Sequence, residues 1–436
     1  MFTVRQSRFA WRLLAAPLLV LLLTGCTKRD DDLVTLRFWN GFTGPDGRTM
    51  LRIVKEFNRT HPSIRVRMQR IPWGLYYNKL FVAGIGRRAP EVFVIHSDSL
   101  ERFIQAHIAG RVDNLVALPG GIDSSDIVAN AWQAVEDGGS HYGMPLDVHL
   151  LGMYYNKALF REAGLVDDRD TPILPRTREE FITTLKALTR DLDGDGRPDE
   201  WGMVFTWLRT NVSTIMKQWG GEFLNDTQTA CTLNNPENVA ALQFCVDLIQ
   251  KYKVAPPLDL VDAWVGVRQG KVGLAFEGIY MLGDIERLDT LDMGTAAMPW
   301  LGPHRAVWAN SHTLCIREGL DPRVRTAAWQ FVEYLSDQSL DWAQAGQVPV
   351  RKSLLDSDRF KEMDAQRAFA EALPYIFYFP RVPWLHEFQT EFDYAVEQAL
   401  RGSLTPQEAL DQATTNINEI IERYNALLAT SGSDGS

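Results

Sequence analysis

The first third of the chain alternates between strand and helix patterns, and this alternation limits the possible folds more than any other feature. Residues 34–39, 64–68 and 91–95 have the period-two or short apolar character of β-strands. Helical spacing separates them, at residues 48–57 and 76–85. This alternation predicts an α/β fold, in which a parallel or mixed sheet is covered on both faces. Ligands of such sheets bind beyond the carboxyl ends of the strands.

The rest of the chain is richer in helix. Thr177 and Glu180 have the spacing of a capping box at the start of one helix. Asn235 and Pro236 open another helix. Further helical patterns end the chain, at residues 323–335, 385–400 and 406–428. We therefore expect a helix-rich second half.

The N-terminus has the features of an export signal that ends at a cysteine. Arginines at positions 5, 8 and 12 precede a mostly apolar run, residues 13–23, that is too short to span a bilayer as a stable helix. The following Leu23-Thr24-Gly25-Cys26 resembles a bacterial lipobox, in which the cysteine is lipidated and becomes the new N-terminus. The alternative is an ordinary signal peptide with an incidental cysteine.

This pattern predicts a lipoprotein that works outside the cytoplasm. We expect a signal peptide over residues 1–25, a palmitate-bearing anchor at Cys26 and a polar tether over residues 26–32. The anchor holds the protein to the bacterial cell membrane, on the periplasmic side if the cell is Gram-negative.

The mature chain is long, acidic and poor in cysteine. About 411 residues remain after the signal peptide, more than one hydrophobic core usually supports, so we expect two lobes. Loss of the leader arginines takes the formal charge from −10 to about −13, which argues against nucleic acid as a partner. Cys231, Cys245 and Cys315 are too few for a disulfide framework. A Cys231–Cys245 disulfide and two buried free thiols are both open alternatives.

Several segments together resemble extracytoplasmic solute-binding proteins of the maltose-binding-protein class, which serve carbohydrate ABC importers. They occur in order and at sensible intervals over nearly the whole mature chain. They are FWNGF at 38–42 with KEFN at 55–58, APEVF at 89–93, YGMPLD at 142–147 with MYYNKALF at 153–160, QGKVG at 269–273 with FEGIY at 276–280, and GQVPVR at 346–351.

The resemblance implies a two-lobe periplasmic-binding-protein-like fold with hinge crossovers and a helix-rich second lobe. The chain is expected to cross the hinge near residues 144–149, 307–310 and 347–351. The lobes that follow are an N-terminal lobe of residues 33–146 plus 309–347 and a C-terminal lobe of residues 147–308 plus 348–429, with a disordered tail over 430–436. Closure of two lobes around a solute is a hinge motion.

A sugar site needs aromatic rings for the C–H faces of the solute and planar polar side chains for its hydroxyls. The resemblance places Asp98, Asp147 and Tyr280 at the cleft. The full set of candidate ligand-binding residues is Asn40, Phe42, Thr43, Asp98, Asp147, His149, Glu277, Tyr280, Trp308, Asn310, Arg351 and Trp384.

Some aromatic and polar residues have a plain structural alternative. Trp201, Trp207 and Trp219 lie in an apolar setting that we interpret as helical core. Trp73 is expected to pack a strand-to-helix turn rather than to touch solute. For His149 the alternative is a satisfied buried histidine, and for Glu277 it is an ion pair with a structural arginine.

Residues 191–200 have the pattern of a calcium loop. Carboxylates stand at loop positions 1, 3, 5 and 9, and Gly196 stands at position 6, where the turn is sharp. The usual bidentate glutamate at the last position is missing, so another nearby carboxylate must close the shell. The expected ligands of a structural Ca²⁺ are Asp191, Asp193, Asp195, Arg197 through its carbonyl, Asp199 and Glu200. The alternative is a solvated acidic turn.

The function we expect is a lipid-anchored, monomeric receptor that captures a sugar or oligosaccharide between two lobes and delivers it to an ABC transporter permease. One alternative keeps the fold and changes the solute to a polyamine, glycerol phosphate or another small molecule. A second is a secreted carbohydrate-active enzyme, which needs two carboxylates at a set spacing. The sequence contains no Ser/His nucleophile motif, P-loop or catalytic zinc motif, so we expect no catalysis.

Overall fold

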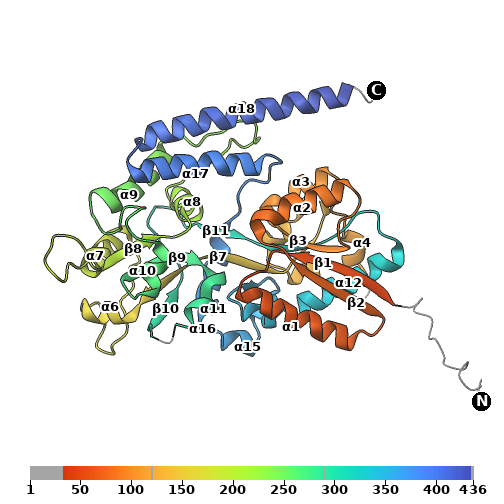
Figure 1. The fold of residues 1–436 in the computed structure, drawn as a ribbon, viewed down its shortest axis with the longest axis horizontal. Helices are drawn as coiled ribbons and strands as arrows, with labels where there is room; N and C mark the ends of the chain where they lie inside the picture. The colour runs from red at the N-terminus through yellow and green to blue at the C-terminus, as the bar shows by residue number, and fades with distance from the viewer. Residues whose placement is uncertain (1–32, 119–120, 289, 434–436) are drawn as a thin grey trace, which may run out of the picture.

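The computed structural model describes residues 33–118, 121–288 and 290–433, which form two α/β lobes side by side (Figure 1). The predicted signal peptide, the lipid-bearing Cys26 and the tether lie outside the described residues. Within those ranges, none of the helices has the length and apolar character needed to cross a membrane. Each lobe is built on its own sheet, as the α/β prediction required.

The sheet of the first lobe contains the three predicted strands. Its order is β2 (Ile64–Arg70), β1 (Val34–Asn40), β3 (Val92–His96), β12 (His312–Ile316) and β6 (Met144–Pro145). The first three strands are parallel, and β12 runs antiparallel to β3. The sheet is therefore mixed.

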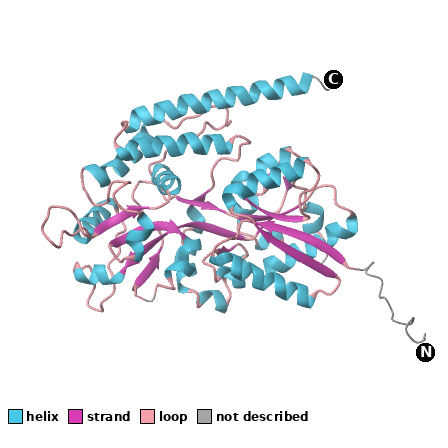
Figure 2. Cartoon of the chain, viewed as in Figure 1, coloured by secondary structure: helices cyan, strands magenta, loops and turns pink. Residues whose placement is uncertain are grey.

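Helices cover both faces of this sheet (Figure 2). The first, α1 (Pro45–Thr60), begins three residues before the predicted start because Pro45 takes the first helical position, where its missing N–H costs nothing. The next, α2 (Trp73–Ile85), likewise begins directly after Pro72. Buried residues of α12 (Pro322–Asp337) complete the core, where Phe331 packs edge-on against Phe38 at 5.2 Å.

The sheet of the second lobe is centred on one long strand. Its order is β14 (Ile376–Phe377), β11 (Val307–Asn310), β7 (Asp147–Asn156), β9 (Val272–Gly278) and β8 (Trp201–Phe205), with β10 (Met293–Ala296) and β13 (Val348–Pro349) also paired to β7. All but one of the ten residues of β7 are buried. A small separate sheet pairs β4 (Glu136–Asp137) with β5 (Ser140–His141).

The chain crosses between the lobes at the three predicted places. Leu146 separates β6 of the first sheet from β7 of the second, and Ser311 separates β11 of the second from β12 of the first. The third crossing is β13, where Val348 pairs with Val148 on β7. Because all three links meet at the start of β7, they form one continuous hinge.

The second lobe is helix-rich, as expected. Its α7 (Arg178–Leu188) begins with the predicted capping box between Thr177 and Glu180, and Asn235 caps α9 (Pro236–Gln250). The longer helices that complete it are α8 (Leu208–Gln218), α17 (Leu385–Arg401) and α18 (Pro406–Ser433). The shorter helices of the chain are α3 (Leu100–Gln105), α4 (Asp113–Val116), α5 (Ala129–Gln133), α6 (Lys157–Glu162), α10 (Ala263–Arg268), α11 (Leu282–Ile285), α13 (Ser339–Ala343), α14 (Lys352–Leu355), α15 (Asp358–Lys361) and α16 (Asp364–Ala370).

The last helix, α18, runs from the second lobe toward the first along one edge of the molecule (Figure 1). Near its end the hydroxyl of Tyr424 donates to Gln105 Oε1 at 2.6 Å, on α3 of the first lobe. The helix continues through residues 430–433, so the prediction of a disordered tail is wrong for these residues. The stretch contains no proline that would break the helix.

The cysteine alternatives are resolved toward free thiols. Cys231, Cys245 and Cys315 are each free and buried. Burial raises the pKa of the Cys231 thiol to about 11, so it is protonated at neutral pH. These side chains act as small apolar groups in the core.

Candidate functional site

The hinge strands gather histidine and aromatic side chains where the two sheets meet. We call the group formed by His96, His149, His312, Asp147, Trp73, Tyr280 and Trp308 the hinge cluster. Its histidines are placed by strand register: His312 on β12 pairs with His96 at the end of β3, and Asn310 on β11 pairs with His149 on β7. The imidazole centroids lie 4.3 to 5.2 Å apart.

Asp147 is the charged centre of the hinge cluster. Its side chain is fully buried, with Oδ2 2.7 Å from His312 Nδ1 and Oδ1 3.2 Å from His149 Nδ1. The indole N–H of Trp342 also donates to Oδ2, at 2.5 Å. Burial opposes ionisation, but His312 and His149 outweigh it and hold the pKa of Asp147 well below its usual range. Asp147 is therefore an ionised residue that orients its neighbours.

Burial favours the neutral form of two of the imidazoles. Burial, reinforced by the neighbouring His312, lowers the pKa of His149 to about 4. Burial also lowers the pKa of His96 well below its ordinary value, again with a contribution from His312. Since Asp147 is a carboxylate that only accepts, the Nδ1 atoms of His149 and His312 carry the proton in these contacts.

On the first lobe, Trp73 packs against this group. Its ring centroid lies 4.5 Å from His96 and 5.9 Å from His312, with the latter pair stacked. A Cβ on Gly41 would lie 2.1 Å from the indole, so a residue without a side chain lets Trp73 approach there. Phe42 is fully buried beneath it, 6.0 Å away. Trp73 and Tyr77 also line a 220 Å³ cavity between α2 and the start of α17.

On the second lobe, the end of β9 supplies an unpaired carboxyl group. Glu277 is fully buried; Oε1 accepts from the N–H of Gly278 at 2.8 Å and Oε2 has no partner. Burial raises the pKa of Glu277 to about 7. The alternative of an ion pair with a structural arginine does not hold among the described residues. Tyr280 follows, 6.2 Å from the His149 ring and 6.4 Å from the indole of Trp207.

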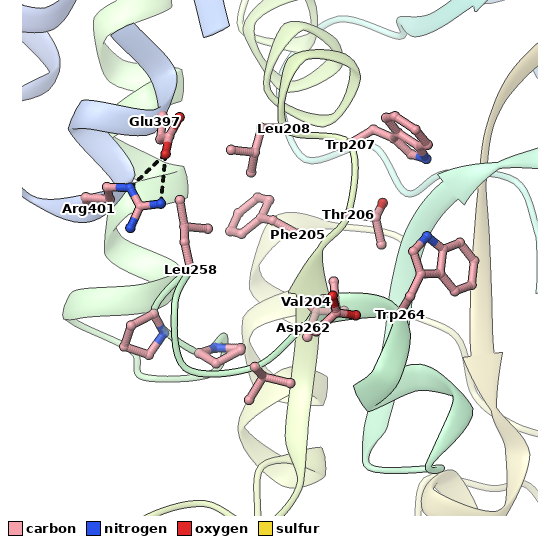
Figure 3. A pocket seen from close by; sticks show the side chains of 14 residues that line it. Val204, Phe205, Thr206, Trp207, Leu208, Leu258, Asp262, Trp264, Glu397 and Arg401 are labelled. Carbon is pink, nitrogen blue, oxygen red and sulfur yellow. Dashed lines mark hydrogen bonds and ion pairs between the residues drawn. The ribbon is translucent and has the colours of Figure 1, made fainter. Parts of the chain in front are cut away.

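The expectation that Trp207 is a core residue is wrong. Its side chain is 49% exposed, because it stands between the carboxyl end of β8 and the first turn of α8 rather than inside a helix. Trp201 is buried as expected, but on a strand, and Trp219 packs against the core. With Trp264, Trp207 borders a 420 Å³ cavity of the second lobe, opposite the Glu397–Arg401 ion pair (Figure 3).

A larger cavity of 760 Å³ lies between the lobes. Asp98 lines it from the first lobe, and Trp384 and Tyr378 line it from the segment before α17. Asp98 is only 5% exposed, accepts from Ser99 Oγ at 3.0 Å and has its pKa raised by burial. Trp384 is buried against Phe388. Two of the candidates from the sequence thus face one cavity.

The remaining candidates are three buried residues near the hinge, one exposed residue and one arginine that forms ion pairs outside the hinge cluster. Asn40 and Asn310 are buried, and each accepts a backbone N–H of its own loop. Trp308 is buried 6.0 Å from the His149 ring, with its indole N–H unpartnered. Thr43 is exposed. Arg351 pairs with Asp126 and Asp337, at 2.9 and 2.6 Å, and is not part of the hinge cluster.

Sequence reasoning missed His96, His312 and Tyr378 and favoured a packing role for Trp73. The available signal was position: His96 ends the third strand, and His312 follows the candidate Asn310 by two residues. Tyr378 is brought in by tertiary structure alone, through a 2.8 Å hydrogen bond with Ser311 Oγ at the second crossing.

The acidic loop is folded around its own backbone. Donor atoms of Asp191, Asp193 and Asp195 lie within 4.8 Å of one another, and all three residues are exposed. The N–H groups of Gly194 and Gly196 both donate to Asp191, at 2.7 and 2.8 Å. These exposed carboxylate oxygens are the hard ligands that Ca²⁺ prefers.

The other predicted ligands of the loop have partners within the protein. Glu200 Oε2 lies 2.5 Å from Arg190 Nη2 in an ion pair. Asp199 Oδ2 accepts the N–H of Leu192 at 2.8 Å. The backbone N–H of Arg197 donates to Asp195 at 2.8 Å. This hydrogen bond does not involve the Arg197 carbonyl, which is the predicted ligand. Closure of a calcium shell by Glu200 would therefore require that it leave Arg190.

The two-lobe fold, the triple hinge and a cavity between the lobes define a solute receptor. The chain belongs to the bacterial extracellular solute-binding protein family, whose model matches residues 42–338. It is 23% identical to a putative binding protein of Brucella abortus (strain 2308), BAB2_0491, over 94% of this chain and 98% of that protein. It is 20% identical to the sn-glycerol-3-phosphate-binding periplasmic protein UgpB of Escherichia coli (strain K12), over 90% of this chain and 93% of that protein.

Solved structures of similar proteins share the whole fold. The sugar-binding protein MalE from Xanthomonas citri superimposes with a TM-score of 0.77 at 21% identity, covering 91% of this chain and 99% of that one. The substrate-binding protein Lmo0181 from Listeria monocytogenes, in complex with cycloalternan, gives a TM-score of 0.76 at 22% identity and covers 90% of this chain and 100% of that one.

Proposed function

We propose that this protein is the solute receptor of a bacterial ABC importer and that its solute is a sugar or oligosaccharide, bound without chemical change. The main support is the cavity between the lobes. Its 760 Å³ lie in the range of small-molecule sites, about 300–1,000 Å³. Because residues of both lobes line it, a solute held there would favour the closed arrangement of the hinge.

The lining suits a polyhydroxylated solute. Tyr378, Phe379 and Trp384 supply aromatic surface for the C–H faces of a sugar ring. Asn130 and Gln133 supply amide groups that donate and accept at once, as hydroxyls require. The similar structures add support from outside the chain, because MalE is a sugar-binding protein and Lmo0181 was solved in complex with cycloalternan.

The charge of the lining favours a neutral or cationic solute over a phosphate. Three acidic residues, Asp98, Glu101 and Asp137, line the cavity with Arg381 as the one basic residue among the described lining. Arg381 in turn donates to the carbonyl of Ala134 at 3.2 Å. Glycerol phosphate, the solute in the name of one relative, would meet this acidic surface unfavourably. A polyamine is the second candidate, since the same carboxylates would attract it.

A thermal-shift screen of the purified protein tests the solute class. The panel contains mono-, di- and oligosaccharides, polyamines and glycerol phosphate, each at several concentrations. A bound solute at a hundredfold excess over its Kd stabilises the folded state by about 2.7 kcal/mol. We expect stabilisation by a sugar, with the sugar recovered unchanged. Stabilisation by polyamine or phosphate alone would contradict the sugar assignment, and turnover of the sugar would contradict the receptor role.

We also propose that the receptor is a monomer held near its permease by a lipid on Cys26. Support comes from the lipobox-like Leu23-Thr24-Gly25-Cys26, whose cysteine stands seven positions before the first described residue, Leu33. Palmitate labelling of cells that express the full chain tests this: label is expected on the protein and is expected to be lost in Cys26→Ser.

A structural Ca²⁺ in the acidic loop is a further proposal. Its support is the proximity of three exposed carboxylates, which repel one another unless a cation lies among them. Asp191, Asp193 and Asp195 would hold the ion, with the Arg197 carbonyl and Asp199 completing the shell. Glu200, which is paired with Arg190, would join only by exchanging partners.

A further inference from the structure

Three histidines of the hinge cluster converge on one point. One ring nitrogen from each of His96, His149 and His312 lies within 4.8 Å of the other two. His149 and His312 are buried, and His96 is partly buried. A tetrahedral ion with bonds to nitrogen of about 2.0–2.1 Å holds its ligand atoms about 3.4 Å apart, so binding would draw these three nitrogens closer together.

The surroundings of the rings match those of metal-ligating histidines. Such histidines almost always hydrogen-bond through their other ring nitrogen to a carboxylate, carbonyl or water, which fixes tautomer and orientation. Here Asp147 binds Nδ1 of both His149 and His312, and the Tyr77 hydroxyl binds Nδ1 of His96. Among the described residues, every hydrogen bond to the three rings uses Nδ1, so each Nε2 is left without a partner.

The tautomers also fit. Because a carboxylate only accepts, the Nδ1 atoms of His149 and His312 donate to Asp147, and Nε2 is the nitrogen of each ring that these hydrogen bonds leave for a metal. The carboxylate side chain of Asp147 is fully buried and contacts two of the three rings. A cation is the ligand that uses both features, since it takes the lone pairs and is attracted by the carboxylate.

We propose that His96, His149 and His312 form a binding site for one divalent transition-metal ion of the zinc class, which bridges the two lobes at the hinge. Neutral imidazole suits zinc, copper and nickel, whereas Ca²⁺ and Mg²⁺ prefer oxygen. Three protein ligands leave a fourth position, which water or a solute oxygen fills. His96 and His312 belong to the first sheet and His149 to the second, so the ion ties the lobes together.

Metal titration of the full chain, purified without a histidine tag and stripped with a chelator, tests the site. Isothermal titration with Zn²⁺ is expected to show one tight site per chain. Replacement by Co²⁺ is expected to give visible absorption bands that report nitrogen coordination. His149→Gln and His96→Gln are each expected to abolish the tight site and the bands, and Asp147→Asn to weaken it by about 10- to 100-fold.

Two control variants separate this site from others. His107→Gln changes a histidine whose side chain is 84% exposed, and binding is expected to be unchanged. The triple variant Asp191→Asn, Asp193→Asn and Asp195→Asn removes the acidic loop, and the tight Zn²⁺ site is expected to persist. Far-ultraviolet circular dichroism confirms that each variant is folded.

The proposal is overturned if the wild-type chain binds no Zn²⁺ tightly, or if folded His149→Gln and His96→Gln both bind it as the wild type does. Loss of the tight site in the loop variant, with retention in the histidine variants, would overturn it equally. The thermal-shift screen with solutes is a separate measurement, so failure of either proposal does not decide the other.

Discussion

At the scale of single residues, a buried polar group without a hydrogen-bond partner carries a cost that can be measured. Glu277 is the clearest case, because it is fully buried with one carboxyl oxygen unpartnered. Such a group is kept neutral, is paired by a ligand, or lowers stability.

The pKa of Glu277 predicts a pH-dependent stability. Its folded value of about 7 lies above the ordinary value of 4.5. The folded state therefore holds the proton more tightly than the unfolded state, and the stability from this group is complete below pH 4.5 and lost as the pH rises through 7. The full effect is about 3 kcal/mol.

Glu277→Gln is expected to match the wild type in free energy of unfolding at pH 4.5 and to exceed it at pH 8, by up to about 3 kcal/mol. Denaturant titrations at a series of pH values measure the difference. Glu371→Gln, at an exposed position, is the control and is expected to show no such trend. Equal curves for Glu277→Gln and wild type at both ends of the range would refute the assignment.

Asp98 predicts a solute-binding defect. A hydrogen bond to a charged group contributes about 1.5–3 kcal/mol, so Asp98→Ala is expected to weaken binding of the solute found in the screen by about 10- to 100-fold. Asp168→Ala, at an exposed position of the second lobe outside the cavity lining, is expected to bind as the wild type does. Isothermal titration of both variants measures this, and an unchanged Kd for Asp98→Ala would place the solute elsewhere.

At the scale of elements, local signals located most helices and strands but not their partners. The capping box at Thr177 and the prolines at helix starts act through the nearest backbone, so the sequence is enough to place them. The prediction for Trp207 was wrong because an aromatic residue at a strand end and one inside a helix look alike in the local sequence. His312 was missed because only the pairing of β12 with β3 brings it beside His96.

The acidic loop is an element whose stability should depend on metal. If the loop holds Ca²⁺ as we propose, its removal with a chelator leaves the carboxylates of Asp191, Asp193 and Asp195 to repel one another. We expect the melting temperature to fall on chelation and to recover when Ca²⁺, but not Mg²⁺, is restored. The triple asparagine variant of these residues is the control and should be insensitive to chelator. A wild-type transition that does not move would contradict a calcium site.

At the scale of the whole molecule, α18 connects the lobes outside the hinge. Its Tyr424 hydroxyl donates to Gln105 on the first lobe, a contact that exists only while the lobes are close. A net hydrogen bond contributes about 1 kcal/mol, or roughly a fivefold change in an equilibrium constant. This contact therefore biases the receptor toward closure before solute arrives.

Tyr424→Phe is expected to shift the free receptor toward the open state by about fivefold and to weaken solute binding by up to the same factor. Small-angle X-ray scattering of the free protein should show a larger radius of gyration. Tyr394→Phe, on the exposed side of α17, is the matched control and should leave both measurements unchanged. An identical scattering profile for Tyr424→Phe and wild type would exclude a role of this contact in closure.

The two-lobe arrangement followed from chain length and the resemblance, whereas the details of the hinge needed the structure. Length alone requires more than one core but does not say where the chain returns. The interior of the hinge cluster depends on three crossings that are far apart in sequence, at Leu146, Ser311 and Val348. No local pattern in the sequence shows that these three segments come together on β7.

The three crossings also determine how many ways the lobes can move. A single link would let one lobe swivel freely, and two would still permit twisting about the line that joins them. Here β11 and β13 both pair with the first residues of β7, so the links form one narrow ribbon that bends readily only across its plane. We therefore expect the lobes to move mainly by bending across this ribbon, so that the distance between two labels, one on each lobe, describes the state of the entire receptor.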